Sequence, residues 1–205
     1  MLKPDSLIGR LLGRALDQLL VSLLCILLCL PVVTAGPALT SLYAVEMKIA
    51  QGEEGGVLPV FFAEFKNSFK RSSLIGLFFL VLLALLGGAF YLLLTHKVPV
   101  LLYIVGLILL AILFALLWVF PLMAKFEDQM LNTVKNAFLL SFVYFPTTIL
   151  MVILRLIPVG IFLVLPKGML LTYVGFWVFF FPGLTSLLDC LILKNIFKHY
   201  SKEDV

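Results

Sequence analysis

Two charged residues stand among apolar neighbours, and their types and spacing make them the first candidates for chemistry. Arg155 lies within the apolar stretch 137–165, and Glu46 lies near the end of a shorter helical segment, 37–50. An arginine at the centre of a spanning helix costs at least about 2.5–3.5 kcal/mol, so such a residue usually has a partner. At about 1.5 Å per residue, both lie about 15–16 Å from the outer turns. We therefore predict a buried Glu46–Arg155 pair that orders the helices or serves binding or gating.

The remaining reactive side chains form no catalytic or metal-binding pattern. Cys25 and Cys29 are one helical turn apart in an apolar run, where small thiols serve as packing residues. His96 and His199 lie far from them in the sequence, which leaves a metal without enough ligands. Phosphate-binding loops, nucleophile elbows and zinc-protease motifs are absent from the sequence. We predict that the protein is not an enzyme and needs no cofactor or metal.

Other polar residues have simpler expected roles. Asp17 and Asp189 fall near helix ends that we expect to face the cytoplasm, and we predict that water reaches both. Hydroxyl side chains near prolines can bond the backbone carbonyls that a proline leaves free. This group comprises Thr34, Thr40, Ser41, Thr147 and Thr148.

The composition indicates that these residues sit in a membrane protein. Of 205 residues, 63% are hydrophobic and only 13% are charged. Soluble domains are about half apolar and about a quarter charged, so this chain has too little polar surface to cover a soluble globule. The net charge of +4 includes no clustered run of Lys and Arg, which argues against nucleic-acid binding.

The apolar residues form long continuous runs without strand alternation, which predicts an all-α polytopic membrane protein with one domain, 1–205. We expect a bundle of five to six membrane-embedded helices. Their approximate ranges are 15–33, 37–50, 73–95, 100–120, 137–165 and 169–193. Two amphipathic segments, 58–72 and 124–136, are predicted to lie in the interface, with the aromatic face of 58–72 in the lipid. For 58–72, the alternative is the juxtamembrane start of the next span.

The stretch LPVVTAGPALTSLYAVEMK, residues 30–48, decides the topology. It contains the helix-break motif Pro31, Thr34, Gly36 and Pro37, and it suits a signal-peptidase site, an external loop or a turn inside the membrane. An external loop divides the basic residues nine to five between the two sides.

A turn at 34–37 instead puts twelve basic residues inside and only Lys97 and Lys167 outside. The positive-inside rule favours this turn, with both termini in the cytoplasm. The short helix 37–50 then crosses fully or is re-entrant, and it is a candidate interior element.

A short internal similarity accompanies this arrangement. GPALTSLYAV, residues 36–45, is similar to PGLTSLLDCL, residues 182–191, and both place Leu-Thr-Ser-Leu after a Gly/Pro pair. A duplicated three-helix unit, as found in many transporters, explains the similarity; a chance match is the alternative.

The motif Pro-x-x-Thr-x-Gly-Pro-Ala-x-x-x-Leu-Tyr, which begins at Pro31, resembles the signature of the YesL-like family. FFAEFKNSFKRSS, the stretch around KFEDQMLNTVKN and the final FFFPGLTSLLDCLILKNIFKHY fit the same family, so the resemblance covers nearly the whole chain. This is a bacterial integral membrane family of unknown function. The resemblance implies a location in the bacterial cytoplasmic membrane. It also implies genes beside carbohydrate ABC importers, polysaccharide-degrading enzymes and two-component sensors.

Two functions compete on this basis. The first is a non-enzymatic accessory component of carbohydrate uptake or sensing, with the lipid bilayer around it and a carbohydrate ABC permease or sensor kinase as its partner. The alternative is a small transporter or channel, working as a homo-oligomer around the Glu46–Arg155 pair. The scarcity of polar residues on inward faces favours the accessory function.

Overall fold

A computed structural model describes residues 7–53, 56–127, 129–166 and 169–203, which form α-helices without strands. The helices are α1 (Leu7–Cys29), α2 (Val32–Gln51), α3 (Val57–Thr95), α4 (Pro99–Lys125), α5 (Met130–Val143), α6 (Phe145–Val164) and α7 (Leu170–Glu203). By length and composition, α3, α4, α6 and the segment Phe179–Lys198 of α7 can each cross a membrane. The chain is an all-α polytopic membrane protein, as predicted.

The break between the first two helices lies at Leu30–Pro31, earlier than predicted. Pro31 has extended backbone angles (φ −76°, ψ 123°) and is the N-cap of α2. A proline stops the preceding helix and has no N–H group to leave unpaired at the new helix start. The Thr34 hydroxyl donates to the carbonyl of Leu28 and, at 2.8 Å, to that of Pro31, so it closes the turn. The predicted turn at 34–37 is wrong, because those residues lie inside α2.

Helix α2 is the buried centre of the fold, as its polar composition suggested. Residues 36–47 are buried except for the half-buried Leu39, and α2 contacts α1, α3, α4 and α7. Gly36 lets α3 approach closely, since a Cβ there would collide with the backbone carbonyl of Ser72. Thr40 Oγ1 lies 3.0 Å from Ser72 Oγ across the same contact. Small residues thus bring two helix backbones together, as is common inside membrane proteins.

Helix α3 merges two predicted elements. The interfacial segment 58–72 and the span 73–95 are one continuous helix of 39 residues, about 58 Å long at the rise of an α-helix. A separate helix over 58–72 therefore does not form, which supports the alternative of a juxtamembrane start of the next span; the position of these residues relative to the membrane stays a prediction. Phe61 is fully buried while Phe62 is half exposed, so the phenylalanine face does not lie wholly in lipid.

The predicted helix 137–165 is divided in two. Helix α5 ends at Val143 and α6 begins at Phe145, with Pro146 in its first turn. Thr148 stabilises the junction, since its hydroxyl lies 2.9 Å from the carbonyl of Ser141 and accepts a hydrogen bond from Trp118 Nε1 at 2.9 Å. The predicted interfacial helix 124–136 is not one helix either, because it spans the end of α4, a connection and the start of α5.

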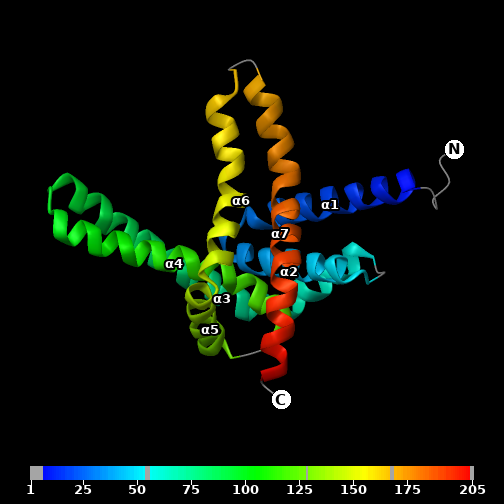
Figure 1. Ribbon diagram of the computed structural model, residues 1–205, viewed down its shortest axis with the longest axis horizontal. Coiled ribbons are helices and arrows are strands. Elements are labelled where there is room, and N and C mark those ends of the chain that lie inside the picture. Colours follow the sequence, from blue (N-terminus) through cyan, green and yellow to red (C-terminus); the bar gives the residue numbers. More distant parts are fainter. Residues whose placement is uncertain (1–6, 54–55, 128, 167–168, 204–205) are drawn as a thin grey trace.

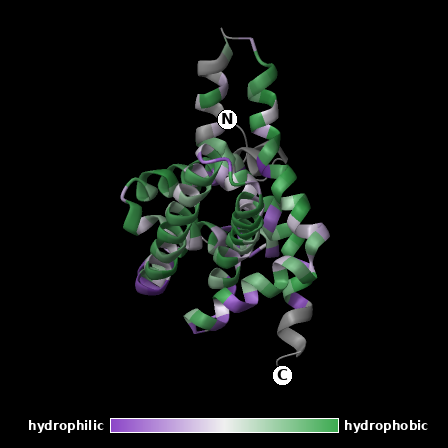
Figure 2. Ribbon diagram, turned by 90° about the vertical axis from the view of Figure 1, so that its left-hand side faces the viewer, coloured by the Kyte–Doolittle hydropathy of each residue, from purple (hydrophilic) through white to green (hydrophobic). Residues whose placement is uncertain are grey.

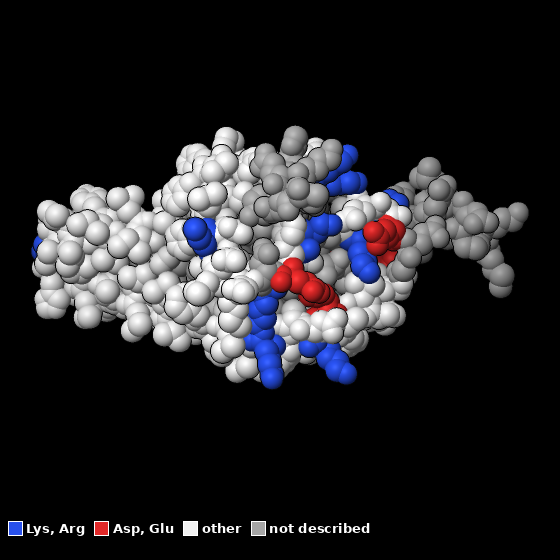
Figure 3. Space-filling model, turned by 90° about the horizontal axis from the view of Figure 1, so that it is seen from below, with Lys and Arg blue, Asp and Glu red and all other residues white. Residues whose placement is uncertain are grey.

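Two helical hairpins leave the core in different directions: α3–α4 extends to one side and α6–α7 extends upward (Figure 1). The main core joins residues of α2, α3, α4, α5, α6 and α7, and includes Trp118, Val119, Leu122, Ala137, Met151 and Leu193. Hydrophobic residues cover most of the helical ribbon (Figure 2). Lys and Arg side chains gather on the underside, with acidic side chains among them (Figure 3). Lys3 and Lys167 lie outside the described residues, and the cytoplasmic location of the termini stays a prediction.

Candidate functional site: a buried ion pair between three helices

Arg155 forms the centre of the most polar cluster inside the helical core. Its Nη2 atom lies 2.6 Å from Asp189 Oδ2 and 2.7 Å from the hydroxyl of Tyr43, and its Nη1 atom lies 3.4 Å from Asp189 Oδ1. Nη1 also donates to the Met151 carbonyl at 3.2 Å. The guanidinium therefore binds the carboxylate in a bidentate geometry, which makes such pairs strong. It ties α6 to α7 and α2.

Tyr43 closes this cluster into a triangle. Its hydroxyl donates to Asp189 Oδ2 at 2.9 Å while accepting from Arg155. Asp189 has no exposed surface, whereas the Arg155 side chain keeps 29% of its surface exposed. Each charge thus has its counter-charge and a shared hydroxyl, which offsets the cost of removing them from water. The cluster has no unpaired group that could act as a nucleophile.

The predicted Glu46–Arg155 pair does not form. Arg155 binds Asp189 instead, and Glu46 Oε1 accepts a hydrogen bond from Gln18 Nε2 at 2.7 Å. Counting depth from the outer turns assumed that the helices stand parallel, but α2 runs across α7 in the fold (Figure 1). The expectation that water reaches Asp189 is wrong for the same reason, since α2 covers that carboxylate.

Glu46 is the buried acid that this cluster leaves aside. It lies one turn beyond Tyr43 on α2 and has no exposed surface. Its Oε2 atom has no hydrogen-bond partner among the described residues. A buried carboxylate oxygen without a partner is costly, so Glu46 is the least compensated acid in the described core.

The neighbouring contact between α1 and α7 explains how Gln18 reaches Glu46. Ser22 Oγ accepts a hydrogen bond from the backbone N–H of Gly183 at 3.0 Å. Gly183 has no side chain, and a Cβ there would collide with Gln18 and Ser22. The glycine therefore makes room for the Gln18 amide beside α2 and α7.

The two similar sequence stretches have the same local bonding. Ser41 donates to the carbonyl of Pro37 at 2.8 Å, and Ser186 donates to the carbonyl of Pro182 at 2.8 Å. In each helix the serine hydroxyl bonds the carbonyl of the proline that stands four residues earlier. The shared sequence therefore serves a shared helix geometry. A duplication of three helices stays a prediction.

The described part of the chain forms no metal site and no site for thiol chemistry. No group of three or more His, Cys, Asp and Glu side chains there could hold a metal ion. Cys25 and Cys29 share a helix face as predicted, with their sulfur atoms 3.9 Å apart. Cys190 is buried, and its thiol lies 3.8 Å from the carbonyl of Tyr43. These thiols fill space between helices.

Sequence reasoning missed Tyr43, Asp189 and Gln18 as members of this region. One signal was available, because Asp189 follows an apolar stretch and is as costly in a membrane as Arg155. No spacing rule identifies Tyr43, whose role depends on how α2 crosses α7.

Comparisons with known proteins leave the activity open. Residues 19–88, which include the second half of α1, all of α2 and most of α3, match a family model described as a protein of unknown function, DUF624. The chain is 34% identical over 128 residues to the uncharacterized protein YteU of Bacillus subtilis (strain 168). That match covers 58% of this chain and 54% of the relative, so the chain spans about half the length of the curated relative it matches. No solved structure matches the chain.

Proposed function

We propose that this protein is a non-catalytic accessory component of a membrane assembly, held to its partner through the apolar faces of its two hairpins. This proposal rests on one observation: the rest of the chain leaves these apolar faces exposed. Only 6% of the most apolar window of α3, 17% of that of α4 and 11% of that of α6 is buried within the chain. Lipid or other helices must therefore cover them.

The α3–α4 hairpin and the end of α6 expose large apolar side chains. Leu85 is 68% exposed, Tyr103 73% and Leu107 67%, and Leu163 near the tip of α6 is 78% exposed. Because helix association in membranes depends on close packing, such faces can seat the helices of a neighbouring subunit.

The interior favours this accessory function over transport. Arg155, Asp189 and Tyr43 satisfy one another, and Thr148 bonds Trp118. The pair that motivated the transporter alternative is not formed. One observation still favours that alternative, namely the unpartnered and buried Oε2 atom of Glu46.

More specifically, we propose that the protein belongs to a YesL-like family and that its accessory role is in carbohydrate uptake or sensing. It is supported by the motif from Pro31 to Tyr43 and by the match of residues 19–88 to the family of unknown function. The resemblance, through its genomic neighbours, suggests a carbohydrate ABC permease or a sensor kinase as the partner. The bacterial cytoplasmic membrane is the proposed location.

Photo-crosslinking at native expression levels tests the proposal. A photoreactive phenylalanine analogue replaces Leu107, which is exposed on α4, and in a matched variant replaces Phe114 on the same helix, which is only 7% exposed. Cells grow on complex carbohydrates, and adducts are identified by mass spectrometry. We expect the Leu107 variant to capture one permease or sensor kinase and the Phe114 variant to give adducts within its own chain.

Two results would overturn the accessory function. If Leu107 captures only a second copy of this chain, the protein is a homo-oligomer and transport becomes the better proposal. If it captures only lipid under every growth condition, the hairpin faces the bilayer and seats no partner.

A further inference from the structure

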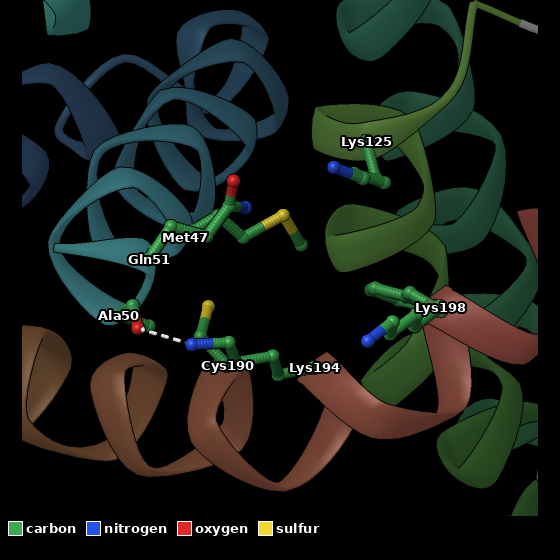
Figure 4. A pocket seen from close by; sticks show the side chains of 8 residues that line it. Met47, Ala50, Gln51, Lys125, Cys190, Lys194 and Lys198 are labelled. Carbon is green, nitrogen blue, oxygen red and sulfur yellow. Dashed lines mark hydrogen bonds between the residues drawn. The ribbon is translucent and has the colours of Figure 1, made fainter. Parts of the chain in front are cut away.

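A hollow of about 400 Å³ lies where the C-terminal ends of α2 and α4 meet α7. Its lining combines Met47, Ala50, Gln51, Cys190 and Phe197 with three lysines, Lys125, Lys194 and Lys198 (Figure 4). The volume falls within the range of small-ligand sites, about 300–1,000 Å³. Its floor is largely apolar, and every charge among its lining residues is positive.

The three lysines come from two helices and are differently engaged. Lys194 Nζ donates to the carbonyl of Ala50 at 3.0 Å, which uses one of its three N–H donors. Lys125 and Lys198 form no ion pair or hydrogen bond with the described residues, and Figure 4 shows both side chains directed into the space between the helices. Two free ammonium groups therefore face the same hollow.

Lys125 and Lys198 are not needed to satisfy the helix ends around the hollow, whereas Lys194 bonds the Ala50 carbonyl near the end of α2. At the end of α2, the N–H groups of Gly52 and Glu53 already bond the carbonyls of Ile49 and Lys48. At the end of α4, the Phe126 N–H bonds the Leu122 carbonyl at 2.8 Å. The positive charge is thus available to something outside the chain.

An adjoining hollow provides a contrast. It has about the same size, 390 Å³, and shares Met47, Gln51 and Lys125 with the first. Glu53 and Glu64 also line it, so its lysines face carboxylates within the same hollow. Lys125 lines both hollows, whereas Lys194 and Lys198 line only the first, whose lining contains no carboxylate.

We propose that the hollow lined by Lys125, Lys194 and Lys198 binds a phosphate-bearing anion. Lysine binds phosphate as a point charge, and basic pockets between membrane helices hold lipid headgroups. A phospholipid headgroup and a soluble phosphate ester share this chemistry. The apolar floor of Met47, Cys190 and Phe197 favours a phosphate that is attached to an apolar chain.

Native mass spectrometry of the detergent-solubilised full chain tests the site. The protein is incubated with phosphatidylglycerol or with phosphatidylcholine, and the retained lipid is counted. The double variant Lys125→Gln/Lys198→Gln removes the two free cations. Its matched control, Lys66→Gln/Lys70→Gln, removes the same charge from a separate hollow lined by Phe65 and Phe69.

We expect the wild type and the Lys66/Lys70 control to retain phosphatidylglycerol over phosphatidylcholine. The Lys125/Lys198 variant should lose about thirtyfold in apparent affinity, as expected when two cations beside an anionic headgroup are lost. A third variant, Gln51→Trp, fills the hollow without a change of charge and should also lose the lipid.

A parallel arm titrates inorganic phosphate. Displacement of the lipid at millimolar phosphate, or phosphate binding with no lipid preference, assigns the site to a soluble phosphate ester. Equal losses in both double variants would show diffuse surface attraction and overturn the site. Absence of both lipid preference and phosphate binding in the wild type would overturn it as well.

Discussion

At the residue scale, Arg155 shows what a sequence reveals about a buried charge and what it does not. A lone arginine in an apolar stretch predicts a partner, because its desolvation must be compensated. Which partner it takes depends on the crossing of α2 over α7, where Tyr43 of α2 bonds Asp189 of α7. The need for a pair was therefore predictable and its identity was not.

The Arg155 triangle predicts coupling between two residues that are distant in sequence. Asp189→Asn should destabilise the protein by about 1.5–3 kcal/mol, the usual range for hydrogen bonds to a charged group. Tyr43→Phe should cost less, since the ion pair persists. Because the two side chains share a hydrogen bond of 2.9 Å, the double variant should lose less than the sum. Thermal unfolding in detergent measures all three.

Tyr91→Phe is the control for the tyrosine change, because Tyr91 is 68% exposed on α3. It should leave the unfolding temperature unchanged. Strictly additive losses for Tyr43→Phe and Asp189→Asn would contradict the shared bond.

At the element scale, the long apolar runs predicted the helices well and their boundaries poorly. Hydropathy locates α4 and the spanning part of α3, but it does not show that α3 starts at Val57 or that a break divides α5 from α6 near Tyr144. Prolines gave mixed signals: Pro31 ends a helix, whereas Pro37 and Pro182 lie inside α2 and α7. Tertiary packing and hydroxyl groups decide which proline breaks a helix.

The contact between α2 and α3 predicts intolerance at Gly36. Gly36→Ala should destabilise the fold by about 1–3 kcal/mol, because its Cβ would collide with backbone rather than with a flexible side chain. Gly87→Ala in α3 is the matched control, since a Cβ there meets nothing within 4 Å. The control should be neutral or stabilise by up to about 1 kcal/mol, because alanine favours the helix.

Thermal unfolding of the two purified variants distinguishes these outcomes. Equal stability of Gly36→Ala and Gly87→Ala would show that α2 and α3 can separate at little cost, contrary to the close approach described above.

At the scale of the whole molecule, the core buries its polar residues. The two hairpins, in contrast, leave most of their apolar surface exposed. Composition predicted the membrane class, since no soluble globule hides 63% hydrophobic residues. The different directions of the two hairpins were not predictable, because they follow from packing around α2 (Figure 1).

Exposure on the α3–α4 hairpin predicts where a charge blocks membrane insertion. Leu107→Arg places a cation in the middle of the exposed face of α4, and its insertion should become less favourable by about 2.5–3.5 kcal/mol. Leu131→Arg is the control, since Leu131 is 83% exposed near the start of the less apolar α5. Glycosylation mapping of the inserted fraction should show a loss for Leu107→Arg alone. Equal insertion of both variants would place the α4 face outside the lipid.

The bond between Arg155 and Asp189 also imposes an order on biosynthesis. Tyr43 has left the ribosome long before Arg155, but Asp189 follows 34 residues later. Until α7 emerges, α6 carries a cation without its carboxylate, which disfavours its release into lipid. The last two helices are therefore expected to integrate as one unit, and a chain that stops before Asp189 leaves an unpaired charge for cellular quality control to recognise.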